Sequence, residues 1–223
     1  MKAPKDIVKN GYDRVSFAYR EDSPDRASES YKQYEAWITE LSGYLHASSS
    51  VLDLGCGCGV PAAQLLGKRF RVTGVDISTV QIERARKLVP DARFILGDMS
   101  EVEFEPSEFD AVVCLYAIIH VPLAEQRRLL TNMSKWLKAG GLLLLSAGYR
   151  EWTGRESDWL GIDGAEMYWS HADRDTYLDW LMEEGLVIVW DRFVPEANGG
   201  HPLFLARKGR SGQQMHPTFY AGD

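Results

Sequence analysis

The sequence has no long hydrophobic run. None of its apolar stretches approaches the roughly 20 residues that a membrane-spanning helix needs, and residues 1–6 have no apolar segment behind them, unlike a secretory signal peptide. We therefore expect a cytoplasmic protein that does not enter membranes. Its 223 residues are enough to bury a sizeable core.

Cysteine is also scarce, and the 32 acidic residues outnumber the 25 Lys and Arg residues. The cysteines, Cys56, Cys58 and Cys114, are odd in number, and the C-x-C pair lacks a second cluster that would complete a four-ligand metal site. This pattern predicts buried thiols in a reducing compartment and no bound metal. The formal net charge of −7 argues against a protein that binds nucleic-acid phosphates broadly.

Short apolar runs alternate with helical patterns from residue 51 onward. Runs of this kind, bounded by Gly, Asp and Pro, are typical of strands buried on both faces of a parallel sheet, and the alternation predicts a doubly wound α/β fold. The predicted strands are 51–54, 70–75, 93–96, 110–115, 142–147, 186–193 and 202–207. One helix is predicted to begin near residue 61, and three more are predicted over 79–89, 123–138 and 172–184. Asn198-Gly199-Gly200 predicts a hairpin between the last two strands.

The most specific pattern is a glycine turn directly behind the first predicted strand. Gly55, Gly57 and Gly59 alternate there, and Asp76 closes the next apolar run about 20 residues later. Glycine permits a sharp turn and a close approach by a ligand, and an acidic residue at this spacing can accept both hydroxyls of a ribose. The pattern therefore predicts a nucleoside-cofactor site. Its spacing is G-x-G-x-G and not the G-x-G-x-x-G of dinucleotide-binding proteins.

Six segments, in order along the chain, give a more specific resemblance. They are residues 51–59, 74–78, 94–99, 109–114, 117–122 and 137–141. In them the chain resembles the class I S-adenosylmethionine (SAM) dependent methyltransferases. The resemblance implies a seven-stranded, mostly parallel sheet with a C-terminal antiparallel hairpin strand, preceded by N-terminal helices.

The resemblance also implies which residues bind SAM and its product S-adenosylhomocysteine (SAH). Gly55, Cys56 and Gly57 would line the methionine moiety, with Asp53 beneath them holding the turn and an ordered water or the amino group. Asp76 would accept the ribose hydroxyls, since a carboxylate offers two acceptor oxygens to a diol.

Four further residues would complete the cofactor site. Ile77 would pack on the adenine ring, and Asp98 would meet the adenine amino group beside the backbone of Met99. The carbonyl of Leu115 would accept a hydrogen bond from the SAM ammonium. Simple capping of a turn is the alternative for Asp98, as it is for Asp53.

Three side chains are candidates for catalysis, although a base is needed only if the acceptor must lose a proton. His120 follows the fourth predicted strand at the edge where ligands bind in open α/β sheets, and its alternative role is a hydrogen bond at a helix entry. His171 is expected at the start of a helix, with Ser170 or His171 as its cap. Tyr116 is the third candidate, and core packing would explain it equally well.

The segments on either side of the alternating region are rich in aromatic residues. Residues 1–47 are predicted to form two helices as a cap, within which Tyr12 and Tyr19 would fold over the cofactor, as in similar enzymes. Residues 149–170 form an insertion without helical period, for which we favour a lid or pocket wall. Residues 1–208 are interpreted as one domain and 209–223 as a mobile tail. Three arginines, Arg20, Arg150 and Arg155, could hold a carboxylate of SAM or of the substrate. The remaining histidines, His46, His201 and His216, lie outside any motif and are expected to face solvent.

The sequence thus predicts an enzyme that moves the SAM methyl group to a small-molecule acceptor by in-line displacement. An Asn-Pro-Pro-Tyr-like motif, typical of enzymes that methylate base amino groups, is missing after the fourth strand, where residues 114–117 read Cys-Leu-Tyr-Ala. Two alternatives stay open: a SAM-binding protein without its own catalysis, and an NAD-linked oxidoreductase, which the glycine spacing disfavours. The sequence does not specify the oligomeric state.

Overall fold

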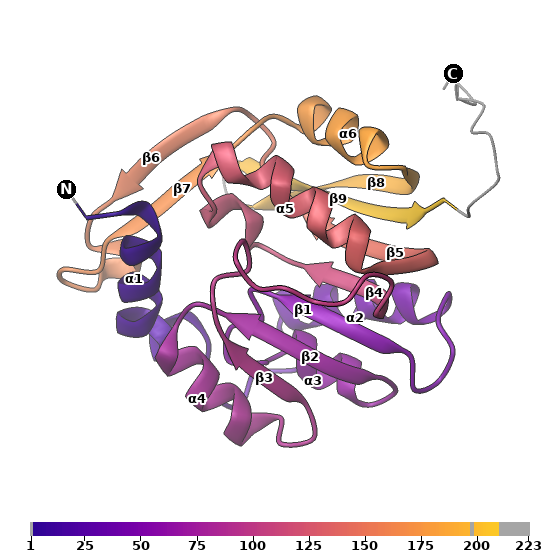
Figure 1. The fold of residues 1–223 in the computed structure, drawn as a ribbon. Helices are drawn as coiled ribbons and strands as arrows, with labels where there is room; N and C mark the ends of the chain where they lie inside the picture. The colour runs from indigo at the N-terminus through magenta and orange to yellow at the C-terminus, as the bar shows by residue number, and fades with distance from the viewer. Residues whose placement is uncertain (1, 197–198, 210–223) are drawn as a thin grey trace.

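A computed structural model describes residues 2–196 and 199–209 of the chain. Its centre is a seven-stranded sheet with the order β3-β2-β1-β4-β5-β9-β8, in which β9 runs antiparallel to both neighbours and the other pairs are parallel (Figure 1). The strands of this sheet are β1 Ser50–Leu54, β2 Arg71–Asp76, β3 Arg93–Leu96, β4 Phe109–Cys114, β5 Leu137–Ser146, β8 Leu186–Glu196 and β9 Gly199–Lys208. This is the sheet that the sequence predicts, with its C-terminal antiparallel pair.

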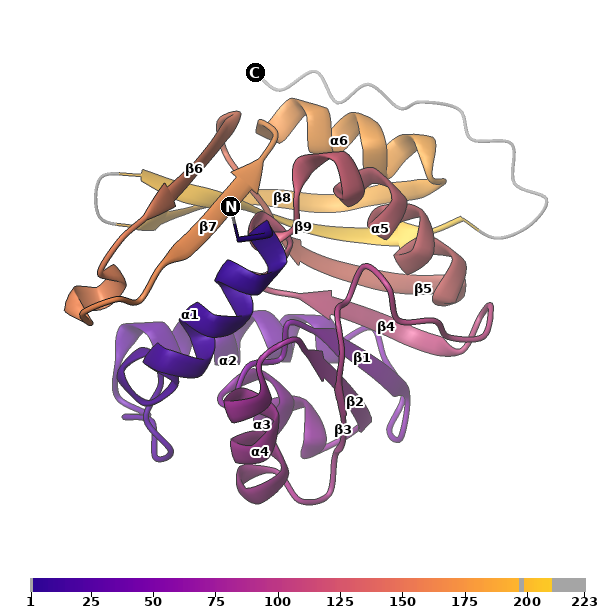
Figure 2. The ribbon, with the colours of Figure 1, turned by 60° about the vertical axis from the view of Figure 1, so that its left-hand side comes forward.

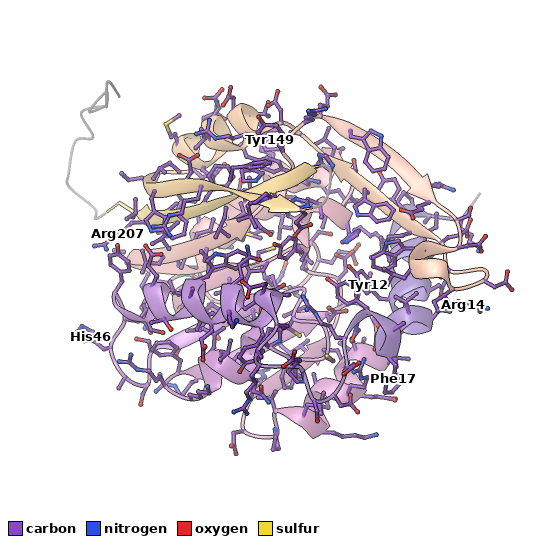
Figure 3. All side chains as sticks on the ribbon, turned by 180° about the vertical axis from the view of Figure 1, so that it is seen from behind. Tyr12, Arg14, Phe17, His46, Tyr149 and Arg207 are labelled. Carbon is purple, nitrogen blue, oxygen red and sulfur yellow. The ribbon has the colours of Figure 1, made fainter. Side chains whose placement is uncertain are left out.

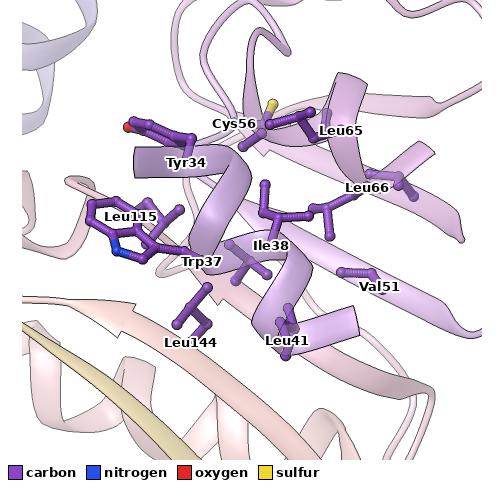
Figure 4. Close-up of a cluster of buried hydrophobic side chains, with 14 of the residues drawn as sticks. Tyr34, Trp37, Ile38, Leu41, Val51, Cys56, Leu65, Leu66, Leu115 and Leu144 are labelled. Atoms are coloured by element: carbon purple, nitrogen blue, oxygen red, sulfur yellow. The ribbon is translucent and has the colours of Figure 1, made fainter. Parts of the chain in front are cut away.

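Helices cover both faces of the sheet. They are α1 Pro4–Tyr19, α2 Glu29–Ser42, α3 Ala62–Gly67, α4 Thr79–Leu88, α5 Leu123–Trp136 and α6 Arg174–Glu183, with the short 3-10 helices η1 Ile118–His120 and η2 Trp159–Gly161. Alternate strand residues point to opposite faces. Val51 and Leu144 therefore meet the α2 side chains Trp37, Ile38 and Leu41 (Figure 4), whereas the neighbouring strand positions pack against α5 and α6.

The junction between α5 and β5 differs from the prediction. The helix was predicted to span 123–138, but it ends at Trp136 and the strand begins at once. Phe109 pairs with Leu137, after which the register shifts so that Ala111 pairs with Leu142. Gly140, with a φ of +80°, lies within this irregularity of β5 and not at the end of a helix.

The 149–170 segment folds as a two-stranded antiparallel ribbon, β6 Trp152–Glu156 and β7 Met167–His171. Figure 2 shows the ribbon beside α1, at the end of the sheet where the parallel strands finish. The helix start expected near residues 170–172 is therefore wrong, because His171 is the last residue of β7 and pairs with Trp152. The α6 helix begins three residues later, where the side chain of Asp173 accepts the N–H of Thr176 at 2.9 Å.

Two further expectations concern the chain ends. Asn198 of the predicted hairpin turn, and residues 210–223 of the predicted tail with His216, lie outside the described residues. Within the described ranges, no helix has both the length and the apolar character that crossing a membrane requires.

Candidate active site

A pocket lies at the carboxyl ends of β1, β2 and β4, under α1. Most of the residues that the sequence singles out line it: Tyr12, Tyr19, Asp53, Gly55, Cys56, Gly57, Asp76, Ile77, Met99, Leu115, Tyr116 and His120. Figure 3 shows the molecule from behind, with Tyr12 toward its interior and His46 on the outer surface at the opposite side. The topology therefore collects residues from at least four elements at one edge of the sheet.

The glycine turn forms the floor of the pocket. The N–H groups of Gly55 and Cys56 both donate to the carbonyl of Val75, at 2.8 and 3.0 Å, which ties the turn to β2. Gly55 has a φ of +70°, and a Cβ there would lie 2.2 Å from the Cβ of Ala117. Gly57 has a φ of +54° with no atom within 4 Å of its would-be Cβ, so its missing side chain leaves open space.

Two buried carboxylates lie beside this turn. Asp76 accepts the N–H of Gly57 on Oδ2 at 2.8 Å and the N–H of Ser78 on Oδ1 at 2.9 Å. Burial raises the pKa of Asp76 to about 6, against the opposing effect of these two hydrogen bonds. Asp53 is 2% exposed, and its Oδ2 has no hydrogen-bond partner among the described residues. Burial, together with the charge of Asp76, raises the pKa of Asp53 to about 7.

Asp98 does not reach the main pocket. It lines a smaller adjoining cavity with Ile77 and Met99, under the first turn of α1. Its Oδ2 lies 2.6 Å from the Nζ of Lys5, and its Oδ1 accepts both the N–H and the hydroxyl of Ser100 at 2.8 Å. Both oxygens already have partners, so the expected contact with an adenine amino group would have to share or replace them.

His120 joins three elements. Its Nδ1 lies 2.8 Å from the carbonyl oxygen of Tyr168 on β7, and its Nε2 lies 3.0 Å from the hydroxyl of Tyr12 on α1. Because a carbonyl only accepts, Nδ1 carries the proton and Nε2 accepts from Tyr12. Burial lowers the pKa of His120 to about 4, so the ring is neutral at pH 7. His120 was expected either to catalyse or to shape the pocket, and its contacts are those of a residue that links α1 to the β6–β7 ribbon.

Tyr116 also lies in the pocket, in an unusual backbone conformation. Its φ is +57°, and its N–H donates to the hydroxyl of Ser146 at 2.5 Å. Burial, and then the neighbouring carboxylate of Glu196, raise the pKa of its phenol. Its ring packs edge-on against His201 at 5.3 Å. His201 is therefore half-buried and not solvent-facing as expected, with Nδ1 2.8 Å from the carbonyl oxygen of Ala147.

His171 is not among the residues that line the pocket or the adjoining cavity. Its ring packs against Gly148, where a Cβ would lie 2.2 Å from Nδ1, and it lies 6.0 Å from the ring of Trp152. Because His171 is the last residue of β7, its ring lies beside Gly148, which follows β5. Of the two candidate histidines, only His120 lines the pocket.

The pocket also contains side chains that sequence reasoning did not place there, notably Tyr34 and Gln81. Tyr34 packs α2 on the sheet and also borders the pocket. Arg20 lines the pocket as well, whereas the other two candidate arginines are exposed. No local signal marks these residues, because they reach the site only through the packing of α1, α2 and α4 on the sheet.

Comparison with known proteins agrees with this architecture. Residues 51–141 match the family model for the methyltransferase domain. Among curated proteins, the chain is similar to sterol 24-C-methyltransferase of Clavispora lusitaniae, with 32% identity over 48% of the chain and 29% of the relative. It is also similar to human glycine N-methyltransferase, with 30% identity over 59% of the chain and 50% of the relative. The matches therefore span half or less of the length of these two relatives.

Among solved structures, magnesium protoporphyrin IX methyltransferase of Synechocystis with bound SAM is similar in fold. Its TM-score is 0.72 at 17% identity, and the match covers 94% of this chain and 99% of that one. A [4+2]-cyclase shares the fold as well, with a TM-score of 0.70 at 17% identity over 91% of this chain and 95% of that one. Residues 51–141 thus match a methyltransferase domain, and the described chain has the class I, Rossmann-like fold that SAM-dependent methyltransferases share.

Proposed function

We propose that this protein transfers the methyl group of SAM to a small-molecule acceptor. The observation that carries the proposal is the convergence, in one pocket, of the glycine turn with Asp53, Asp76 and Leu115. The family match and the fold support a SAM site, and they count against the NAD-linked alternative. We also infer that residues 1–208 act as one domain, since α1 contacts Asp98, Ser78 and Gln81 of the sheet side.

The pocket offers the groups that SAM requires. Asp53 presents a buried oxygen without a partner, which suits an ammonium donor. The open space at Gly57 admits a ligand close to the backbone. Each Asp76 oxygen accepts one N–H and keeps a lone pair for a ribose hydroxyl. We infer that these residues hold the cofactor, with Ile77 and Met99 on its adenine.

When bound, SAM supplies a methyl group already activated by a positively charged sulfur. The chain's own contribution is to orient the acceptor and exclude water. Tyr12 closes the pocket from α1, where its ring packs edge-on against Trp159 and Tyr19, each at 5.4 Å. His120 holds the Tyr12 hydroxyl in place through its neutral Nε2. A ring with a pKa of about 4 is a weak base at pH 7, so we assign His120 to positioning and not to proton removal.

A second candidate function is SAM binding without methyl transfer. The specific observation in its favour is the shared fold of the [4+2]-cyclase, which shows that this architecture also hosts other chemistry. The two functions share the cofactor site and differ in whether a methyl group leaves the cofactor.

Two measurements test the proposal in sequence. Isothermal calorimetry should show that the wild type binds SAH and that Asp76→Ala binds it at least about tenfold more weakly. NADH is the control ligand and should not bind. A panel of small amines, carboxylates and phenols with methyl-labelled SAM then tests transfer. Failure to bind SAH would refute the cofactor assignment, and binding without labelled product from any acceptor would favour the second function.

A further inference from the structure

Arg20 stands at the mouth of the pocket. It follows the C-terminus of α1 and lines both the cofactor pocket and a shallower cavity that extends toward α2 and β8. Tyr19, Tyr34 and Tyr116 are the other residues common to the two cavities. A ligand that reaches from the outer cavity into the pocket therefore passes one guanidinium set among three tyrosines.

The guanidinium is held in place by neutral groups. Its Cζ lies 5.3 Å from the ring centroids of both Tyr19 and Tyr34. Its Nη1 donates to the hydroxyl of Ser30 at 3.3 Å and its Nη2 to the hydroxyl of Tyr34 at 3.4 Å. The backbone is fixed as well, because the carbonyl of Arg20 accepts a hydrogen bond from the guanidinium of Arg84. An arginine fixed in this way loses little entropy when it binds a planar anion.

Arg20 has no carboxylate partner among the described residues. Two other arginines of low or intermediate exposure do pair with acids: the buried Arg84 with Asp22 at 2.7 Å, and Arg174 with Asp191 at 2.5 Å. A guanidinium has five N–H donors, arranged in a fork that matches a carboxylate. In Arg20 the two nitrogens with partners donate only to neutral hydroxyl oxygens, at 3.3 and 3.4 Å. Burial of a cation without a counter-ion is unfavourable unless a ligand supplies one.

We propose that Arg20 binds the carboxylate of a ligand in this pocket. The inference rests on the proposed function, which brings two candidate carboxylates to the site: that of the amino-acid end of SAM, and that of an acidic acceptor. With Asp53 and Asp76 ionised, the three charged groups give this pocket a formal charge of −1, and SAM carries +1 from its sulfonium, ammonium and carboxylate. The pocket thus complements a ligand that carries an anionic group beside positive ones.

Calorimetric titrations of three ligands test the proposal: SAH, its decarboxylated analogue, and 5′-methylthioadenosine, which lacks the amino-acid end. We expect the wild type to bind SAH about 10- to 100-fold more tightly than the decarboxylated analogue, the range of a charge-assisted hydrogen bond. In Arg20→Gln this preference should shrink to less than about threefold, while the affinity for 5′-methylthioadenosine stays unchanged. Arg20→Lys should restore part of the preference, because it restores charge without the fork.

A second arm tests an acceptor carboxylate. With saturating SAH, benzoate, phenylacetate and glycine are titrated as probes, and their thermal stabilisation should depend on Arg20. The matched control is Arg14→Gln on α1, the helix that Arg20 follows, because Arg14 does not line the cofactor pocket and donates to the backbone of Asp163 at 2.7 Å. Arg20→Met is the second variant if Arg20→Gln does not fold.

The outcomes separate the two carboxylates from each other and from failure. Loss of the SAH preference in Arg20→Gln assigns the carboxylate to the cofactor, and loss of the probe response alone assigns it to the acceptor. If Arg20→Gln retains both, the proposal is wrong and Arg20 only packs α1 on α2. If the wild type does not bind SAH, the proposed function itself fails, and this inference fails with it.

Discussion

Asp53 should couple cofactor binding to the release of a proton. Its carboxyl is buried, one oxygen has no partner, and its pKa is raised to about 7. An ammonium placed against it stabilises the charged form, so ligand binding lowers this pKa. At pH 7 half of the free protein carries the Asp53 proton, and binding should release about half a proton.

The magnitude follows from the fraction of ionised Asp53. With a pKa of about 7, that fraction falls about tenfold between pH 8 and pH 6, so the affinity for SAH should fall about tenfold, or about 1.4 kcal/mol. Asp76, with a pKa of about 6, adds about a further twofold loss by pH 6 and more below it. The assay is calorimetry of SAH in two buffers of different ionisation enthalpy, repeated across this range.

Asp53→Asn separates ligand binding from stability. A carboxyl whose folded pKa lies above its unfolded value of 3.8 reduces stability above the folded pKa, and this cost disappears as the pH falls toward 3.8. Removing the charge should therefore raise the free energy of unfolding of the ligand-free protein at pH 8 by up to about 4 kcal/mol, while weakening SAH binding. An affinity that stays constant from pH 6 to 8, with no proton released, would refute the reasoning.

Three further predictions concern the link that His120 makes between α1 and the β6–β7 ribbon, the glycine turn, and the contact between α1 and α4. Because the folded pKa of His120 is lowered from 6.5 to about 4, its neutral ring stabilises the fold above pH 6.5, and this contribution is lost as the pH falls toward 4. In chemical denaturation the stability advantage of the wild type over His120→Asn should thus shrink by about 2 kcal/mol between pH 7 and 5. Gly55→Ala should prevent folding or lower the melting temperature sharply, because the added Cβ would meet Ala117. Gly57→Ala should fold with a penalty of about 1 kcal/mol and bind SAH more weakly. Equal behaviour of the two variants would contradict the assigned geometry. Arg84 is 4% exposed and donates to Ser16 and Arg20, so Arg84→Met should cost about 3 kcal/mol in urea unfolding, and a loss below about 1 kcal/mol would show that α1 is held by other contacts.

Local patterns accounted for the elements that build the cofactor half of the site. The turn at residues 53–57 and the acid at Asp76 lie next to strands whose burial fixes their position, so spacing alone was sufficient. The α5–β5 junction was misread because Gly140 indicates a helix end and a strand irregularity equally well. The start of α6 was misread because Asp173, and not Ser170, supplies the cap.

The other half of the site could not be predicted, because it depends on contacts between distant residues. Lys5 occupies Asp98 from the first turn of α1, an ion pair with no trace in local sequence. The ribbon of residues 152–171 has no apolar period, since β6 is mostly exposed and gains its place by pairing with β7. Tyr34 combines core packing with a place at the pocket, and only the docking of α2 reveals the second role.

The two N-terminal helices that border the pocket are held by different kinds of contact. Helix α2 is fixed by a large apolar face that includes Trp37, Ile38 and Leu41. Helix α1 buries fewer and smaller apolar side chains and is fixed largely by polar contacts, from Lys5 to Asp98 and from Asp13 to Ser78. Polar contacts exchange with water at small net cost, whereas exposing a large apolar face does not. We therefore expect that releasing α1 from the sheet side costs less free energy than releasing α2.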